Sequence, residues 1–66
     1  MNISEVIFNK RRAMGLSIEK LARGAGISYR SVINLEKGRN VPTLSVLERV
    51  CNVLNIEIAL IDKEDE

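Results

Sequence analysis

Hydrophobic residues recur at helical spacing in four segments of the chain, and residues that start or stop helices bound each segment. A residue whose side chain can cap a helix precedes every segment: Asn2, Ser17, Ser28 and Thr43. Gly15 ends the first helix, residues 24–26 close the second, and Gly38 stops the third after Lys37. Asn2 and Glu5 also have the spacing of a capping box. The pattern predicts four short helices within residues 2–54.

The apolar positions of these helices predict the core. One face of the first helix holds Ile3, Ile7 and Met14. Leu16 with Leu21, and Ile27 with Val32, occupy the two positions of a hydrophobic staple around a helix start. The fourth helix carries an apolar stripe formed by Leu44, Leu47, Val50, Cys51 and Leu54. We expect Cys51 to fill the core.

After residue 55 the pattern changes from helical to alternating. Positions 56, 58 and 60 alternate with 57, 59 and 61, and several of these residues are β-branched. The alternation favours a strand over residues 56–61, with a fifth helix as the competing interpretation. A lone strand leaves its backbone groups unpaired, and no other segment of the chain resembles a strand. We therefore expect Ile56, Ile58 and Leu60 to pair with the same segment of a second chain in a homodimer.

The composition excludes most catalytic chemistry. A chain of 66 residues forms one small domain, and it contains no His and a single Cys. A Cys/His zinc site, a disulfide within the chain and a His-containing catalytic triad are therefore excluded. We expect no enzymatic activity and no cofactor. The longest apolar run has four residues, 58–61, so no membrane segment is expected, and we predict a soluble, cytoplasmic protein.

Charge is divided unevenly along the chain. Residues 10–39 contain eight Lys or Arg against two Glu, whereas residues 62–66 contain four acids and one Lys. The middle of the chain is therefore strongly basic, although the net charge of the whole is only +1. A basic middle favours a polyanionic partner, and an ordinary solvated surface is the alternative.

The second and third predicted helices have the arrangement of a helix-turn-helix, in which a Gly-containing turn joins two short helices at a steep angle. Ala22 is small where the two helices are expected to cross. Plotting the third helix at about 100° per residue places Val32, Leu35 and Glu36 inward. The outward face, which is available to DNA, holds Arg30, Ile33, Asn34 and Lys37, with Tyr29 at its edge.

With these motifs the chain resembles the Cro and phage-repressor type of helix-turn-helix domain, the XRE family. The segments that carry the resemblance are residues 16–22, 26–28, 33–38, 42–44 and 54–56. The resemblance covers residues 3–54 and implies a mainly α, four-helix, lambda-repressor-like domain that binds double-stranded operator DNA as a dimer. A C-terminal strand that pairs across a dimer also resembles HipB-type antitoxins.

The resemblance implies a role for individual residues. The base-reading positions of the family fall on Tyr29, Arg30 and Asn34. The positions that grip the DNA backbone fall on Ser17, Ser28, Lys37, Arg39 and Asn40. The family also pairs the residues matching Arg11 and Glu36, as scaffold. Two positions depart from the family pattern: Ile18 replaces a Gln that contacts the backbone, and Ile33 stands where a small or polar residue is usual, able to touch a thymine methyl or a partner protein.

These interpretations predict a helix-turn-helix DNA-binding domain over residues 1–55, a dimerisation strand over 56–61 and an acidic tail over 62–66. The leading functional hypothesis is a homodimeric, sequence-specific repressor that binds a near-palindromic operator. The second hypothesis is a HipB-like antitoxin that binds a toxin protein and represses their shared operon. The third is a helical interaction module that does not bind DNA.

Overall fold

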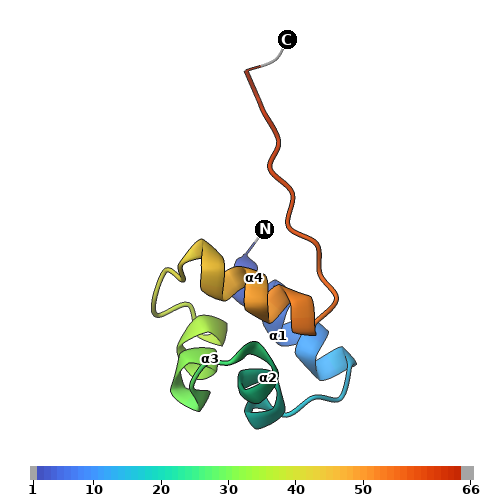
Figure 1. The fold of residues 1–66 in the computed structure, drawn as a ribbon, viewed down its shortest axis with the longest axis vertical. Helices are drawn as coiled ribbons and strands as arrows, with labels where there is room; N and C mark the ends of the chain where they lie inside the picture. Colours follow the sequence, from blue (N-terminus) through green and yellow to red (C-terminus); the bar gives the residue numbers. More distant parts are fainter. Residues whose placement is uncertain (1, 65–66) are drawn as a thin grey trace.

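The computed structural model describes residues 2–64 and contains four helices (Figure 1). Helix α1 spans Ile3–Ala13, α2 spans Ile18–Ala25, α3 spans Tyr29–Glu36 and α4 spans Leu44–Val53. Helix α2 packs against both α3 and α4, and α1 packs against α3. The prediction of four short helices is confirmed.

All four predicted caps are present, and they explain why the helices start where they do. The side-chain oxygens of Asn2, Ser17, Ser28 and Thr43 accept hydrogen bonds from the backbone N–H groups of Ser4, Lys20, Ser31 and Val46. Each bond satisfies a donor that the helix itself leaves unpaired. Gly26 ends α2 in the left-handed conformation, with φ +71°, which a residue without a Cβ adopts at little cost.

Gly24 has a different role from the one its position suggests. The sequence places it at the end of the second helix, whereas the structure continues α2 through Ala25. A Cβ on Gly24 would lie 3.2 Å from Cγ2 of Val53 on α4. Gly24 therefore allows α2 and α4 to approach closely, while Gly26 makes the turn.

The core lies where the four helices meet. Its buried apolar residues are Ile7, Leu21, Ala22, Ala25, Val32, Leu35, Val50, Cys51 and Leu54. The staple residues Leu16 and Ile27 are partly buried against this cluster. Three residues predicted for the core lie at helix ends instead and are about half exposed: Ile3, Met14 and Leu44. A helical stripe predicts a face correctly, but the first and last turns extend past the neighbouring helices.

The predicted strand over residues 56–61 is not present in the single chain, and this expectation is corrected. Ile56 packs against the core, and its backbone N–H donates to the Cys51 carbonyl at 2.8 Å. The following residues form neither a strand nor a fifth helix and run away from the helices in an extended course (Figure 1). Leu60 and Ile61 are 92% and 82% exposed. Strand hydrogen bonds require a neighbouring strand, and residues 2–64 provide none.

Candidate nucleic-acid interface

Helices α2 and α3 form a compact helix-turn-helix unit. Only three residues, Gly26 to Ser28, connect them, and the Ile27 N–H donates to the Ala22 carbonyl at 3.0 Å. The Ser28 hydroxyl accepts from the Ser31 N–H at 3.0 Å, so α3 begins immediately after the turn. The turn and the cap together fix the direction in which α3 leaves α2.

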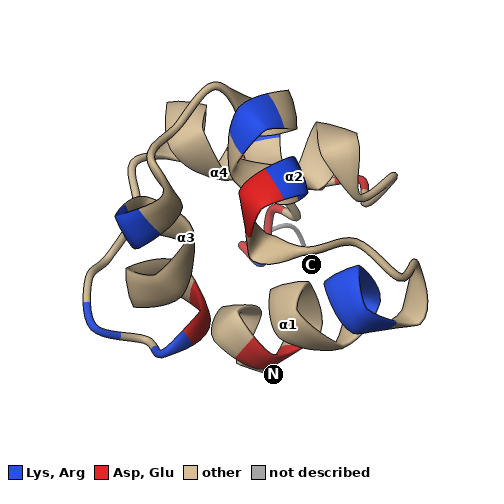
Figure 2. Cartoon of the chain, turned by 90° about the horizontal axis from the view of Figure 1, so that it is seen from below, with Lys and Arg blue, Asp and Glu red and all other residues tan. Residues whose placement is uncertain are grey.

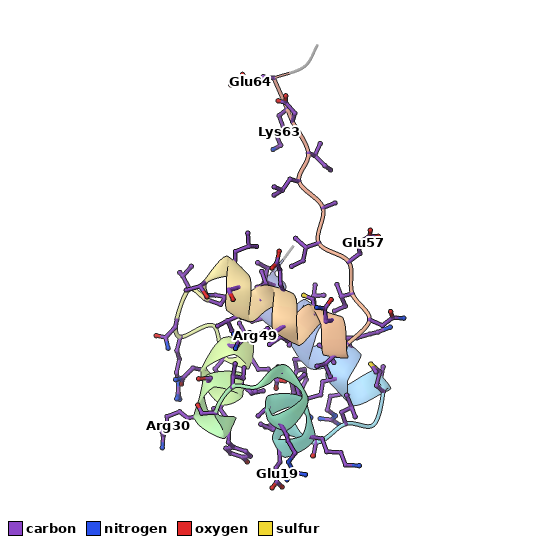
Figure 3. All side chains as sticks on the ribbon, in the orientation of Figure 1. Glu19, Arg30, Arg49, Glu57, Lys63 and Glu64 are labelled. Carbon is purple, nitrogen blue, oxygen red and sulfur yellow. The ribbon has the colours of Figure 1, made fainter. Side chains whose placement is uncertain are left out.

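The two faces of α3 differ sharply. Val32 and Leu35 are buried at 0% and 5% exposure, whereas Tyr29 is 54% exposed and Arg30 is also exposed. Figure 3 shows Arg30 projecting away from the helices, at the end of the molecule opposite the C-terminal segment. These four residues lie as the helical plot predicts, whereas Ile33 and Asn34, which the plot places outward, are partly buried.

Asn34 is less accessible than the other two residues predicted to read bases. Its side chain is partly buried beside the loop after α3, in a shallow hollow that Asn40 and Pro42 also line. Nη1 of Arg39 lies 3.5 Å from its amide oxygen, at the long limit for a hydrogen bond. The loop therefore covers one side of the Asn34 side chain, and the other side stays exposed on the surface of α3.

Figure 2 shows Lys and Arg on α3 and on the loop that follows it, and also on the other three helices. Lys37, Arg39 and Asn40 are exposed after the helix, and Ser17 is exposed at the start of α2. The exposed acid of α2, Glu19, is paired with Arg23 at 3.1 Å, which offsets its negative charge. Ser28, the fifth residue predicted to contact the DNA backbone, caps the start of α3. The structure thus places these residues at the starts of α2 and α3 and around the end of α3.

A buried ion pair connects α1 to α3. Arg11 Nε donates to Glu36 Oε2 at 2.6 Å and Arg11 Nη2 donates to Glu36 Oε1 at 3.0 Å, a two-pronged arrangement of side chains that are 8% and 6% exposed. Arg11 Nη1 also donates to the Leu16 carbonyl at 2.8 Å. The hydrogen bond to Glu36 raises the pKa of Arg11 above its ordinary value. The structure therefore brings together the two residues expected to act as scaffold.

A second contact between α1 and α3 has no counterpart in the sequence interpretation. The Ser4 hydroxyl donates to the Leu35 carbonyl at 2.7 Å, across 31 positions of the chain. The same carbonyl also accepts from the Gly38 N–H at 3.2 Å, so the Ser4 hydroxyl is its second donor at the end of α3. No local pattern marks Ser4 for this role, because the contact exists only once α1 has packed against α3.

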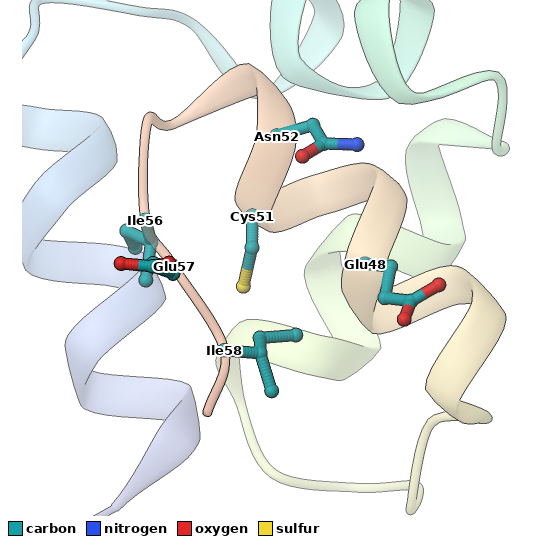
Figure 4. Close-up of a pocket in the computed structure, with 6 residues that line it drawn as sticks. All are labelled: Glu48, Cys51, Asn52, Ile56, Glu57 and Ile58. Carbon is teal, nitrogen blue, oxygen red and sulfur yellow. The ribbon is translucent and has the colours of Figure 1, made fainter. Parts of the chain in front are cut away.

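A hollow on the other side of the molecule has the wrong charge for nucleic acid. It lies between α4 and the C-terminal segment, and Figure 4 shows the carboxylates of Glu48 and Glu57 with Cys51, Asn52, Ile56 and Ile58. Burial raises the pKa of the Cys51 thiol above its ordinary value. Among residues 2–64, no group of three or more His, Cys, Asp or Glu side chains is placed to hold a metal ion.

Comparison with known proteins agrees with this geometry. A sequence model of the helix-turn-helix family matches residues 7–61. The chain belongs to this helix-turn-helix family. A relative from Methanothermobacter thermautotrophicus (strain Delta H), an uncharacterized HTH-type transcriptional regulator, is 36% identical over 52 residues, covering 79% of this chain and 75% of the relative. The resemblance to the XRE type of helix-turn-helix domain is thereby confirmed.

The match to the helix-turn-helix family runs past α4 and includes residues 56–61 of the C-terminal segment. The family is one of DNA-binding regulators, consistent with the exposed polar face of α3. In the described part of the chain, no helix is long and apolar enough to cross a membrane.

Proposed function

We propose that this chain is a sequence-specific DNA-binding transcriptional regulator that inserts α3 into the major groove of its site. The observation that carries the proposal is the exposed face of α3, which presents Tyr29 and Arg30 while the buried Arg11–Glu36 pair ties α3 to α1. Helix α3 has eight residues, and an α-helix with its side chains is about 10–12 Å in diameter. The major groove is about 12 Å wide and admits such a helix.

The side chains on α3 have the chemistry for reading bases. Arg30 can donate two hydrogen bonds to O6 and N7 of a guanine, and Asn34 can pair with an adenine. Tyr29, at the exposed tip of α3, can bind a phosphate or lie against a sugar. These three residues are proposed to contact DNA at its bases and adjoining sugars, with Arg30 as the leading base reader.

A second group is proposed to position the domain on the DNA backbone. It consists of Ser17, Ser28, Lys37, Arg39 and Asn40. The N–H groups at the starts of α2 and α3 can assist, because helix N-termini attract phosphate. These contacts add affinity for any duplex and make binding depend steeply on salt, since bound cations are released from the DNA.

The regulator is proposed to act as a homodimeric repressor at a near-palindromic operator. Residues 58–61 support a dimer, because large aliphatic side chains there lie exposed on an extended backbone, which suits pairing with the same segment of a second chain. The segment leaves from the end of the molecule opposite Arg30, so pairing there leaves both copies of α3 accessible (Figure 3). Half-sites are expected about 34–36 Å apart if the two copies of α3 enter successive major grooves of one duplex.

One titration tests the DNA-reading proposal. A binding site is selected from a random pool of duplexes, and Arg30→Ala and Lys37→Ala are compared on that site and on its single-base variants. Arg30→Ala is expected to weaken specific binding by about 1–3 kcal/mol and to relax one base position, whereas Lys37→Ala weakens binding to all sequences alike. An unchanged sequence preference in Arg30→Ala contradicts the base-reading role. Absence of salt-dependent binding to any duplex favours an interaction module that does not bind DNA.

The exposed segment also supports a second candidate, an antitoxin that binds a toxin protein and represses their shared operon. An extended apolar segment can add to the sheet edge of another protein as well as to its own copy. Purification of the chain together with the product of a neighbouring gene tests this candidate. Copurification that is lost on truncation after Asn55 supports it, and a chain that elutes only with itself contradicts it.

A further inference from the structure

Three apolar side chains from three different helices line one groove beside α3. They are Phe8 of α1, Ile18 of α2 and Ile33 of α3, and the groove has a volume of about 330 Å³. Phe8 is 38% exposed, and the two isoleucines are partly buried. Arg11, Glu36 and Lys37 complete the lining. The cluster of Phe8, Ile18 and Ile33 is therefore an apolar surface with the α1–α3 ion pair at its side.

Ile33 is the member of this cluster that stands among the residues proposed to read DNA. It follows Tyr29 by four positions and Arg30 by three, so the three side chains lie on one side of α3. Isoleucine in a helix has one strongly preferred χ1 rotamer, and the groove leaves Ile33 only partly exposed. The outward face of α3 thus presents a stiff aliphatic side chain within a row of polar ones.

Positive charge borders the cluster, which favours nucleic acid as the group that covers it. The Arg12 guanidinium lies 5.5 Å from the centre of the Phe8 ring and Lys37 lines the groove itself, and both residues are exposed. Arg11 lies 5.6 Å from the same ring, but its charge is offset by Glu36. Cations placed around an apolar surface suit a duplex, whose base edges are flanked by phosphates. An aliphatic side chain in the major groove has one apolar partner on the base edges, the C5 methyl of thymine.

We propose that Ile33 is a specificity-determining residue that selects a thymine by packing against its C5 methyl group. This inference rests on the proposed insertion of α3 into the major groove. Removing one methyl from a well-packed contact is expected to change affinity about fourfold. Ile33 would therefore discriminate thymine at one base pair of each half-site without making a hydrogen bond, adjacent to the position that Arg30 reads.

The test removes the methyl from the DNA and the side chain from the protein separately and together. Each thymine of the selected duplex is replaced in turn by deoxyuridine, which changes only the C5 methyl. Binding is measured for the wild type, Ile33→Ala and Ile33→Val, with Ile18→Ala as a control that alters the same groove away from α3. Thermal unfolding of each variant establishes that binding is measured on folded protein.

At one thymine per half-site, deoxyuridine is expected to weaken wild-type binding about fourfold and to leave Ile33→Ala binding unchanged. Ile33→Val and Ile18→Ala are expected to keep the sensitivity to the methyl. Ile33→Ala could instead be weakened, relative to the wild type, by the same factor on the thymine and the deoxyuridine duplex, or it could keep the wild-type affinity for both. In either case Ile33 acts in packing or on a protein partner, and the proposal is overturned. A wild type that selects a site but ignores every methyl overturns it too, with the regulator function intact. Failure to bind any duplex overturns the proposed function and this inference together.

Discussion

The helical part of the molecule, residues 3–55, and the C-terminal segment, residues 57–64, use the same aliphatic residue types in opposite ways. Leu21 in α2 is 0% exposed, whereas Leu60 in the segment is 92% exposed. In the helical part, caps and turns bring four apolar stripes together, so the chain covers its own hydrophobic surface. In the extended segment, Ile58 and Ala59 still line a hollow beside α1 and α4, whereas Leu60 and Ile61 have no second layer to pack against within the described chain. The same amino acid therefore stabilises the fold in one region and is available to a partner in the other.

The largest expected effect comes from shortening buried and exposed leucines in parallel. Leu21→Ala is expected to lower the free energy of unfolding by about 3 kcal/mol, because a fully buried side chain is replaced by a cavity. Leu44→Ala, at a position 55% exposed, is the matched control within a helix and is expected to cost less than about 1 kcal/mol. Urea denaturation followed by circular dichroism measures both. A loss of equal size at both positions would break the contrast.

The ion pairs provide a second comparison between buried and exposed interactions. Glu36→Gln removes the charge that Arg11 faces in a buried pair and is expected to lower the free energy of unfolding by about 2 kcal/mol. Glu19→Gln alters the pair of Glu19 with Arg23, in which the two side chains are 71% and 74% exposed. This variant is expected to change the free energy of unfolding by about 0.3 kcal/mol. The same urea denaturation applies. A similar small effect for both variants would mean that the Arg11–Glu36 pair connects α1 and α3 without stabilising the fold.

Local sequence signals predict the helices well because their causes are local. A cap at Ser28 and a glycine at position 26 act on backbone groups a few residues away, so both can be recognised without knowing the fold. The outward face of α3 follows from the same reasoning, because a helix fixes which residues share a side. The Arg11–Glu36 pair, separated by 25 positions, was reached through family resemblance and not through spacing.

The features that the sequence did not predict depend on how distant segments meet. The Ser4–Leu35 hydrogen bond requires α1 to lie beside the end of α3, and the groove near Ile33 requires three helices to converge. The alternating residues predict a strand over 56–61, whereas the structure has no strand there, only an irregular segment that leaves the helices after Ile56. Whether that backbone becomes a strand depends on a second chain, and no property of the segment alone decides it.

The third prediction concerns self-association through the C-terminal segment. Leu60→Asp is expected to change the free energy of unfolding of the single chain by less than about 0.5 kcal/mol, because the side chain is already exposed. The same variant is expected to raise the dimer dissociation constant about tenfold or more, because an uncompensated charge would enter the paired surface. Sedimentation velocity over a range of concentrations measures the change, with Lys63→Asp as a control for added negative charge. Equal effects of the two variants, or none, would remove residues 58–61 from the dimer interface.

The smallest expected effect is the pH dependence of stability that comes from Cys51 in the helical part. Burial raises the pKa of the Cys51 thiol above its ordinary value of 9.0, so the folded chain keeps a proton that the unfolded chain releases. The contribution of this proton to stability is complete below pH 9 and declines as the pH rises beyond it. Between pH 8 and pH 10 the wild type is therefore expected to lose more stability than Cys51→Ala, by less than about 1 kcal/mol. A parallel pH dependence of the two proteins in urea denaturation would show that Cys51 is open to solvent like the C-terminal segment, and not enclosed with α4.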